Sequence, residues 1–423
     1  MSHTRETSHP PRIGRSLPFY GWLIVLAAAL TTFSSGPGQS YTFSIVIDPI
    51  LAETGLSRTL LSTLYAGGTA VSAAMTFVVG RLVDRLGARR MLAIVAVLFG
   101  LACVGLSRAQ GVLGLFLGFA ALRALGQGSL PVIATLLTAQ WFVRYRGRAM
   151  ALVTLGFALA NATFPPLTQA LVSSFGWRGA YLALAGLIVV ALLPAALIAR
   201  DRPEALGLFP DGAATPPASE QVLASGAEAT SAPTMRSASF WLLALPLTAG
   251  PFVVTALVFH QVSIFAERGL GAGVAAGVFV AFSAAAASAT LLGGVLIERV
   301  GPKRLLLGNL LLMAVAIASL RLVADPMSAA IYAALLGASS GMQSVASGVA
   351  WATYYGRRGL GRLQGSAAMV GISAAALAPL PLAAWQQAAG SYTPALTAMV
   401  ALPLLGAALL LRFQPPRAPG ATR

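Results

Sequence analysis

Charged residues are scarce in this sequence. Only 9% of its 423 residues are charged and 57% are hydrophobic, whereas soluble domains carry about 25% charged residues. Apolar runs such as residues 21–47 exceed the roughly 20 residues that a helix needs to cross a bilayer core. The scarcity of charge therefore excludes an ordinary soluble protein and predicts a chain embedded in lipid.

Cysteine, histidine and acidic residues are also few. The single cysteine, Cys103, lies in an apolar run and can form neither an internal disulfide nor a thiolate cluster. The predicted spans offer one histidine and no carboxylate, which is too little for a membrane-embedded enzyme. The only lysine, Lys303, stands between proline and arginine, so the phosphate-binding loop of a primary pump is missing. We expect no metal, no cofactor and no enzymatic activity.

The basic residues are unevenly distributed. A net charge of +16 would favour a nucleic-acid partner in a soluble protein. With a cytoplasmic N-terminus, however, most of the 28 lysines and arginines fall in cytoplasmic segments, and the opposite side has only Arg58, Arg108, Arg178, Arg268 and Arg321. The positive-inside rule then places both termini in the cytoplasm. We expect a multi-pass protein of the cytoplasmic (inner) membrane and no nucleic-acid partner.

Breaks in hydropathy predict an all-α membrane protein with twelve transmembrane helices. The spans lie near residues 19–46, 59–79, 91–107, 112–138, 149–174, 179–198, 238–264, 272–296, 304–324, 328–350, 366–388 and 392–412. The expected units are a cytoplasmic tail (1–18), a six-helix bundle (19–199), a cytoplasmic linker rich in Pro, Ala, Ser and Gly (200–237), a second six-helix bundle (238–412) and a cytoplasmic tail (413–423). Pro37, Pro165 and Pro166 predict kinks in the first and fifth spans.

A short charged element occurs twice, as GRLVDRLGARR (80–90) and GVLIERVGPKR (294–304). Its matching positions are Gly80, Asp84, Arg85, Gly87, Arg89 and Arg90 in the first copy and Gly294, Glu298, Arg299, Gly301, Lys303 and Arg304 in the second. Glycine permits positive φ, so each copy predicts a tight turn between two spans. The acid can lie near the N-terminus of a neighbouring helix. We expect both copies to be conformational latches.

The repeated element resembles the signature of the major facilitator superfamily, glycine-x-leucine-x-aspartate-arginine-x-glycine followed by a basic pair. RALGQGS (123–129) is similar to the arginine-x-x-glutamine-glycine pattern of that superfamily, with one residue inserted. Residues 141–152, 175–182 and 354–365 resemble loops of its bacterial branch of oxalate/formate and monocarboxylate-type porters. The resemblance implies two six-helix bundles that rock about a substrate held between them near the bilayer midplane. We expect the protein to be a monomer.

Ionisable residues inside the spans are functional candidates, because burying them in a membrane is costly. Arg123 lies in the middle of the fourth span, where its guanidinium could pair with a substrate carboxylate or tie its helix to the carbonyls of a neighbour. His260 could contact substrate or carry a proton, or it could be hydrogen-bonded at a helix end. Asp48 could border the vestibule or help to end the first helix.

Polar and aromatic side chains complete the candidate substrate site. They are Gln39, Tyr41, Tyr65, Gln127, Asn161 and Gln343. These groups suit a small polar ligand, but each could equally be an interhelical hydrogen bond worth about 1 kcal/mol. Residues 273–294 contain no arginine, although monocarboxylate-type porters commonly place a basic residue in that helix. Arg123 is then the only permanent cation embedded in a span.

The sequence favours a secondary transporter of a small organic solute, first of all an organic anion such as a monocarboxylate, with a coupled proton or a counter-anion. A drug or metabolite exporter of the same superfamily is the second possibility. Residues 156–167 lack the glycine-proline-glycine-glycine character of the antiporter motif, which counts against it. A non-transporting membrane sensor on the same fold is the third possibility.

Overall fold

The computed structural model describes residues 19–142, 145–213, 237–355 and 360–414. Within these ranges the chain is almost entirely helical and has no strand, which confirms the all-helical prediction. Nine of the helices in the described ranges are long and apolar enough to cross a membrane. The predicted tails at 1–18 and beyond 414, and residues 214–236 of the predicted linker, lie outside the described residues.

The first half of the chain folds into helices that follow the predicted spans. They are α1 (Gly21–Phe33), η1 (Gly36–Gly38), α2 (Ser40–Thr54), α3 (Arg58–Leu86), α4 (Ala88–Ser107), α5 (Gly111–Leu122), η2 (Arg123–Gln127), α6 (Leu130–Trp141) and α7 (Arg146–Ile198). The short helices η3 (Pro203–Leu206) and η4 (Pro210–Gly212) follow.

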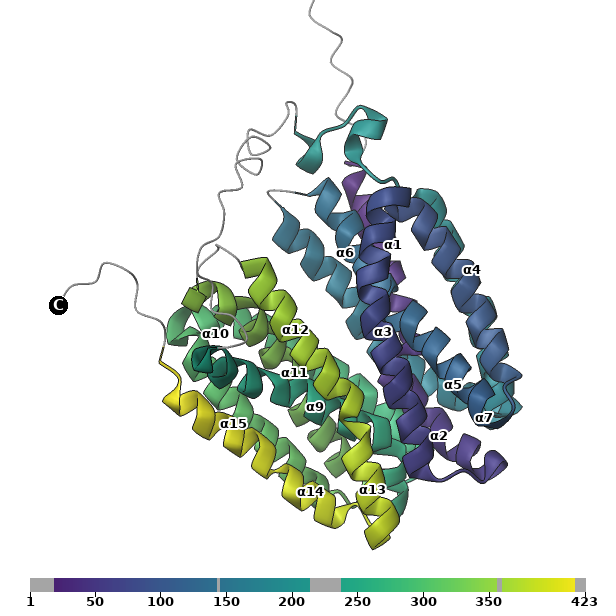
Figure 1. Ribbon diagram of the computed structural model, residues 1–423, viewed down its shortest axis with the longest axis vertical. Helices are drawn as coiled ribbons and strands as arrows, with labels where there is room; N and C mark the ends of the chain where they lie inside the picture. Colours follow the sequence, from purple (N-terminus) through teal and green to yellow (C-terminus); the bar gives the residue numbers. More distant parts are fainter. Residues whose placement is uncertain (1–18, 143–144, 214–236, 356–359, 415–423) are drawn as a thin grey trace, which may run out of the picture.

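The second half is helical as well. Its helices are α9 (Ala238–Glu267), α10 (Ala272–Ser319), η5 (Leu320–Leu322), α11 (Pro326–Tyr355), α12 (Leu360–Leu377), α13 (Pro379–Ala389), α14 (Thr393–Met399) and α15 (Ala401–Arg412). Buried apolar side chains form two clusters, one mostly from each half. Figure 1 shows the first half in purple to teal and the second half in green to yellow, on different sides of the molecule.

Glycines interrupt the two longest helices. Gly176 in α7 has φ +67° and Gly301 in α10 has φ +78°, and side chains other than glycine rarely adopt such angles. Each long helix is therefore two helices that meet at a glycine. In contrast, α7 runs through Pro165 and Pro166 with helical backbone angles, so the expected kink there produces no break.

The first span differs from its prediction in length. It breaks at Gly36–Gly38, as Pro37 predicts, but α2 then continues through Pro49 to Thr54, past the predicted end at residue 46. A proline still permits helix on its C-terminal side, and α2 ends only at Gly55, where φ is +67°. Asp48 therefore lies inside a helix rather than at its end.

The helices run between two opposite ends of the molecule. The linker end holds the turn between α3 and α4, the last turn of α7 and residues 199–213. There, the indole N–H of Trp141 donates to the carbonyl of Arg200 at 2.8 Å. The opposite end holds the last turns of α2 and α13 (Figure 1).

Candidate functional site

A cavity of about 570 Å³ lies between the two halves of the chain, in the part of the molecule nearer the linker end. It is lined by one face each of α9, α11 and α12, together with Gln127 from the first half. The lining residues are Gln127, Ala244, Leu247, Thr248, Pro251, Thr255, Ser347, Gly348, Trp351, Ala367, Ala368, Gly371, Ile372 and Ala375. None of them is charged.

Sequence reasoning missed most of the polar groups of this cavity. Thr248, Thr255, Ser347 and Trp351 line it, whereas Gln127 is the predicted site residue found there. The spacing of these residues in the sequence could have identified them. Thr248 and Thr255 are two helical turns apart, and Ser347 and Trp351 are one turn apart, so each pair shares a helix face. In an apolar span, a polar pair at helical spacing marks the face that avoids lipid.

Arg123 is fully buried and hydrogen-bonded to two other helices. Its Nη1 donates to the carbonyl oxygen of Gly38 at 3.0 Å, and its Nε donates to Oγ1 of Thr69 at 3.1 Å. The guanidinium carbon lies 4.6 Å from the ring centre of Tyr65, which suits a cation–π contact. These contacts are those of a tie between helices, and Arg123 does not line the cavity.

The residue inserted into the arginine-glutamine-glycine pattern corresponds to a local widening of the helix. Arg123–Gln127 form a π-helix, in which the Gly128 amide donates to the Arg123 carbonyl at 3.0 Å. A single turn of this kind accommodates one extra residue. Gly126 there packs closely against the break in the first span, since a Cβ on Gly126 would lie 2.9 Å from Cα of Gly38.

The other predicted site residues of the first half are mostly buried. The hydroxyl of Tyr65 forms a 2.7 Å hydrogen bond with that of Ser40, and the Gln39 amide donates to Ser35 at 3.2 Å. Tyr41 packs 6.2 Å, ring to ring, from Phe279 of the second half. The Tyr41 hydroxyl and Oδ1 of Asn161 are buried and have no hydrogen-bond partner among the residues that the structure describes. Neither residue lines the cavity.

Gln343 connects three helices of the second half. Its side-chain amide donates to the carbonyl of Leu247 at 2.7 Å, and its Oε1 accepts from the Asn309 amide at 2.7 Å. Its side chain is almost fully buried behind the cavity wall. Gln343 therefore forms interhelical hydrogen bonds, which is one of the two roles expected for the polar candidates.

His260 of α9 is buried against the start of α13. Its Nε2 lies 2.9 Å from the Pro379 carbonyl and its Nδ1 lies 3.2 Å from the Tyr392 hydroxyl. A carbonyl can only accept, so Nε2 carries a proton and donates. The Tyr392 hydroxyl can in turn donate to Nδ1. The neutral imidazole thus has a partner on each nitrogen.

The two halves of the chain meet in a polar cluster at the opposite end. Asp48 of α2 and Arg58 of α3 form an ion pair at 2.6 Å. The Ser263 hydroxyl of α9 donates to both Asp48 oxygens at 2.9 and 3.0 Å and accepts from Arg58 Nη1 at 2.6 Å. Thr59 also donates to Gln387 of α13. We call Asp48, Arg58, Ser263, Thr59 and Gln387 the end clasp.

The repeated charged element forms the expected tight turns. α3 ends at Leu86 and α4 begins at Ala88, with Gly87 between them at φ +85°, and Gly301 has nearly the same backbone angles. The Asp84 side chain lies outside the described residues. Asp201, after the end of α7, instead accepts the backbone N–H of Arg89 at 2.8 Å, so a residue that the sequence did not suggest caps α4.

The second copy contacts the end of its half in a different way. Lys303, the counterpart of Arg89, donates to the carbonyls of Leu411 at 3.1 Å and Phe413 at 2.7 Å. Both copies therefore join their turn to the end of the last long helix of the same half. The remaining latch residues lie on the helices that flank these turns: Gly80 and Arg85 on α3, Arg90 on α4, and Gly294, Glu298 and Arg299 on α10. Of residues 354–365, which resembled a porter loop, 356–359 lie outside the described residues.

Curated relatives of the chain are transporters rather than enzymes. Monocarboxylate transporter 1 of Bos taurus is 25% identical over 207 residues, which cover 45% of this chain and 39% of that protein. Monocarboxylate transporter 11 of Homo sapiens is 30% identical over 286 residues, covering 66% and 56%. Riboflavin transporter RibJ of Trypanosoma brucei brucei is 26% identical over 186 residues, covering 43% and 34%. The chain thus spans between 34% and 56% of the length of these relatives.

Solved structures share the fold over nearly the whole chain. The D-xylose-proton symporter matches with a TM-score of 0.75 and 15% identity, covering 94% of this chain and 98% of that one. A bacterial homolog of the human lysosomal transporter Spinster, inward-facing and unoccupied, matches with a TM-score of 0.70 and 17% identity, covering 93% and 95%. The family model of the Major Facilitator Superfamily matches residues 24–279, more than half of the chain. The chain therefore belongs to the Major Facilitator Superfamily and is related to its monocarboxylate branch.

Proposed function

We propose that the protein is a secondary transporter that moves a small organic solute across a membrane by alternating access. One observation carries this proposal: the end clasp joins the halves of the chain at one end, and toward the other lies a cavity lined by the second half and by Gln127 of the first. Opening the clasp while closing the walls of the cavity would expose the same site to the other side. The known relatives, which are transporters, support this function.

The proposal includes twelve membrane crossings in two bundles, and the same helices support it. Two of the nine apolar helices in the described ranges are far longer than one crossing and break at Gly176 and Gly301. α11 is as long as α9 and forms a further crossing in this proposal. The bundles then comprise residues 19–199 and 238–412, both termini lie in the cytoplasm, and a monomer is sufficient. The turns at Gly87 and Gly301 act as latches at the linker end.

The cargo that the cavity suits best is a small monocarboxylic acid carried in electrically neutral form. The relatives among monocarboxylate transporters support the acid. The described lining of the cavity supplies hydroxyls, an amide and an indole but no cation, and a carboxylate without a partner is costly to bury. A proton that travels with the carboxylate removes this cost. The site is then Gln127, Thr248, Thr255, Ser347 and Trp351.

Uptake into proteoliposomes tests this function. The panel would contain labelled monocarboxylates, a dicarboxylate and an uncharged flavin, measured with and without an inward proton gradient and at clamped membrane potentials. We expect monocarboxylate uptake that rises with the proton gradient and does not respond to the potential. Uptake that responds to the potential, or a preference for the dicarboxylate, would contradict neutral carriage. A preference for the flavin would move the cargo to uncharged heteroaromatic solutes.

Gln127→Leu tests the site within the same assay. The substitution removes the amide from the cavity wall at similar size, so the KM for the acid should rise severalfold. Thr135→Val is the matched control, because Thr135 lies in the adjoining α6 with an exposed side chain outside the cavity. Equal KM values for the two variants would exclude Gln127 from the site.

A further inference from the structure

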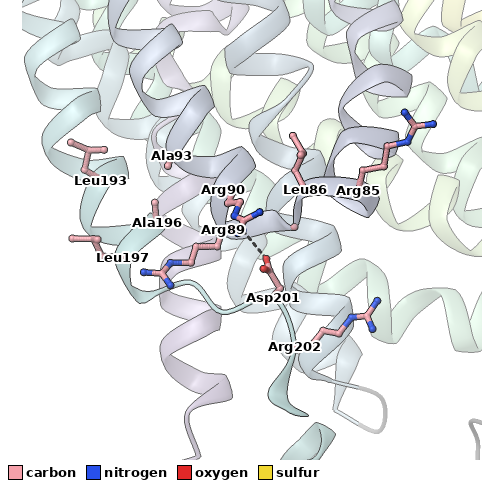
Figure 2. A pocket seen from close by; sticks show the side chains of 11 residues that line it. Arg85, Leu86, Arg89, Arg90, Ala93, Leu193, Ala196, Leu197, Asp201 and Arg202 are labelled. Carbon is pink, nitrogen blue, oxygen red and sulfur yellow. Dashed lines mark hydrogen bonds between the residues drawn. The ribbon is translucent and has the colours of Figure 1, made fainter. Parts of the chain in front are cut away.

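A second, larger hollow lies at the linker end, away from the proposed transport cavity. It has a volume of about 830 Å³ and is formed by the turn between α3 and α4, the last two turns of α7 and the residues that follow them (Figure 2). Its lining residues are Arg85, Leu86, Gly87, Arg89, Arg90, Ala93, Leu193, Ala196, Leu197, Asp201 and Arg202. It shares no residue with the cavity between the halves.

The charges around this hollow are strongly unbalanced. Of its described lining residues four are arginines and one, Asp201, is an acid. One oxygen of Asp201 already accepts the Arg89 backbone N–H, as the dashed line in Figure 2 shows. Among the side chains that the structure describes, which do not include that of Asp84, the ion pairs are Asp48–Arg58 and Glu53–Arg178, so neither involves these arginines. The hollow is therefore complementary to an anion.

The other wall of the hollow is apolar. Leu193, Ala196 and Leu197 project from the end of α7 (Figure 2), and Leu197 is 66% exposed. They belong to the apolar stretch Arg148–Ile198 that is suited to cross a membrane. The arginines of the hollow lie beside the end of that stretch. This is the depth at which basic side chains meet lipid headgroups. A soluble anion would leave the leucines exposed, whereas an acyl chain would cover them.

We propose that this hollow binds an anionic phospholipid of the adjoining leaflet. Arg89 and Arg90 contact its phosphate, and Arg85 and Arg202 add positive charge at the rim. One acyl chain lies along Leu193 and Leu197. Basic pockets between membrane helices bind phosphodiester headgroups by the same chemistry.

The second half of the chain supplies a natural comparison. Its counterpart of Arg89 is Lys303, whose ammonium group is bound to the carbonyls of Leu411 and Phe413. That lysine is thus already engaged at the end of its own helix bundle. The lipid site is therefore predicted for the first copy of the repeated turn, and the second copy offers control substitutions of equal charge.

Native mass spectrometry of the full-length, delipidated protein in a non-ionic detergent tests the proposal. The probes are phosphatidylglycerol and phosphatidylcholine with identical acyl chains, and glycerol 3-phosphate as a headgroup without chains. The variants are Arg89→Gln/Arg90→Gln, the single change Arg202→Gln in case the first variant fails to fold, and the control Arg299→Gln/Arg304→Gln. All of these arginines are exposed.

We expect phosphatidylglycerol to bind wild type more tightly than phosphatidylcholine. Loss of Arg89 and Arg90 should weaken its binding about 30-fold, at roughly 1 kcal/mol for each basic residue near an anionic headgroup. Arg202→Gln should weaken it about fivefold, and the control should stay within about twofold of wild type. Equal binding of the two lipids, equal losses in variant and control, or binding of glycerol 3-phosphate as tight as that of the lipid would each overturn the proposal.

Discussion

Arg123 and Gly38 are joined by a hydrogen bond of 3.0 Å at the point where the first membrane helix breaks. The break leaves the Gly38 carbonyl without its usual helical partner, and the buried guanidinium supplies one. The partner residue is itself at the start of the π-turn in the fourth span. Two irregular stretches of backbone therefore stabilise each other through one side chain.

Substitution of Arg123 should lower stability more than it changes substrate affinity. Arg123→Lys keeps the charge but loses the planar fork that reaches both Gly38 and Thr69. Arg123→Gln loses the charge as well. We expect each change to destabilise the protein by about 1–3 kcal/mol, as for other buried hydrogen bonds to charged groups. Thermal unfolding of purified protein, with and without a monocarboxylate, measures both effects.

Thr69→Val is the matched control for Arg123, because it removes one acceptor of the guanidinium and leaves the charge in place. It should show a smaller loss of stability and no loss of affinity. A variant Arg123→Gln that folds as well as wild type but no longer responds to monocarboxylates would instead place the guanidinium at the substrate.

His260 should be dispensable as a proton carrier but not as a hydrogen-bond donor. His260→Gln places an amide N–H near the position of Nε2, so it should preserve stability. The glutamine cannot titrate, but proton-driven uptake should also persist, because we expect His260 to carry no proton. His260→Leu leaves the Pro379 carbonyl without its donor and should cost about 1–2 kcal/mol. Uptake at several pH values and thermal unfolding distinguish the two roles. If proton-driven uptake vanished in His260→Gln while folding stayed intact, His260 would be part of the proton path.

The two turn glycines should respond differently to the same substitution. Gly87 and Gly301 have φ of +85° and +78°, in a region that costs other residues about 1–3 kcal/mol. A Cβ on Gly301 would meet open space, whereas a Cβ on Gly87 would lie 2.7 Å from Cγ of Asp201. Gly87→Ala should therefore lower the melting temperature more than Gly301→Ala does.

Asp201→Ala checks the cause of that difference. Alone it removes the cap from α4 and should cost about 1 kcal/mol. Combined with Gly87→Ala it also removes the clash, so the double variant should be more stable than the sum of the single changes predicts. Strict additivity would mean that Asp201 does not press against the turn.

Local sequence patterns predicted the helices and turns but not the contacts between them. Gly87 and Gly301 marked their turns because a positive φ is a property of one residue. The position of Arg123 in its span could also be read from the sequence. Its partners could not, because Gly38 and Thr69 lie far away in the chain and become neighbours only when helices pack.

The end clasp shows the same limit more clearly. Asp48 was noticed as an acid near a helix end, but Arg58 and Ser263 carried no signal in their own segments. Ser263 lies 215 positions from Asp48, and only the approach of the two halves brings them together. In the cavity, Thr248 and Ser347 escaped notice because small hydroxyl residues are common in apolar helices, where they often bond to their own backbone.

Cross-linking the end clasp tests alternating access most directly. Cys103 is buried, so a Cys103→Ala background leaves introduced cysteines as the reactive thiols. Thr59→Cys and Gln387→Cys would join the two halves at the opposite end through a short, reducible bifunctional reagent. Glu53→Cys and Arg178→Cys are the control, because that contact lies at the same end within the first half.

The measurement is uptake into proteoliposomes before cross-linking, after it, and after reduction. Under alternating access, the Thr59–Gln387 cross-link abolishes uptake, a reductant restores it, and the Glu53–Arg178 cross-link leaves it nearly unchanged. Full uptake by protein whose two halves are completely cross-linked at Thr59 and Gln387 would contradict transport by alternating opening of the two ends.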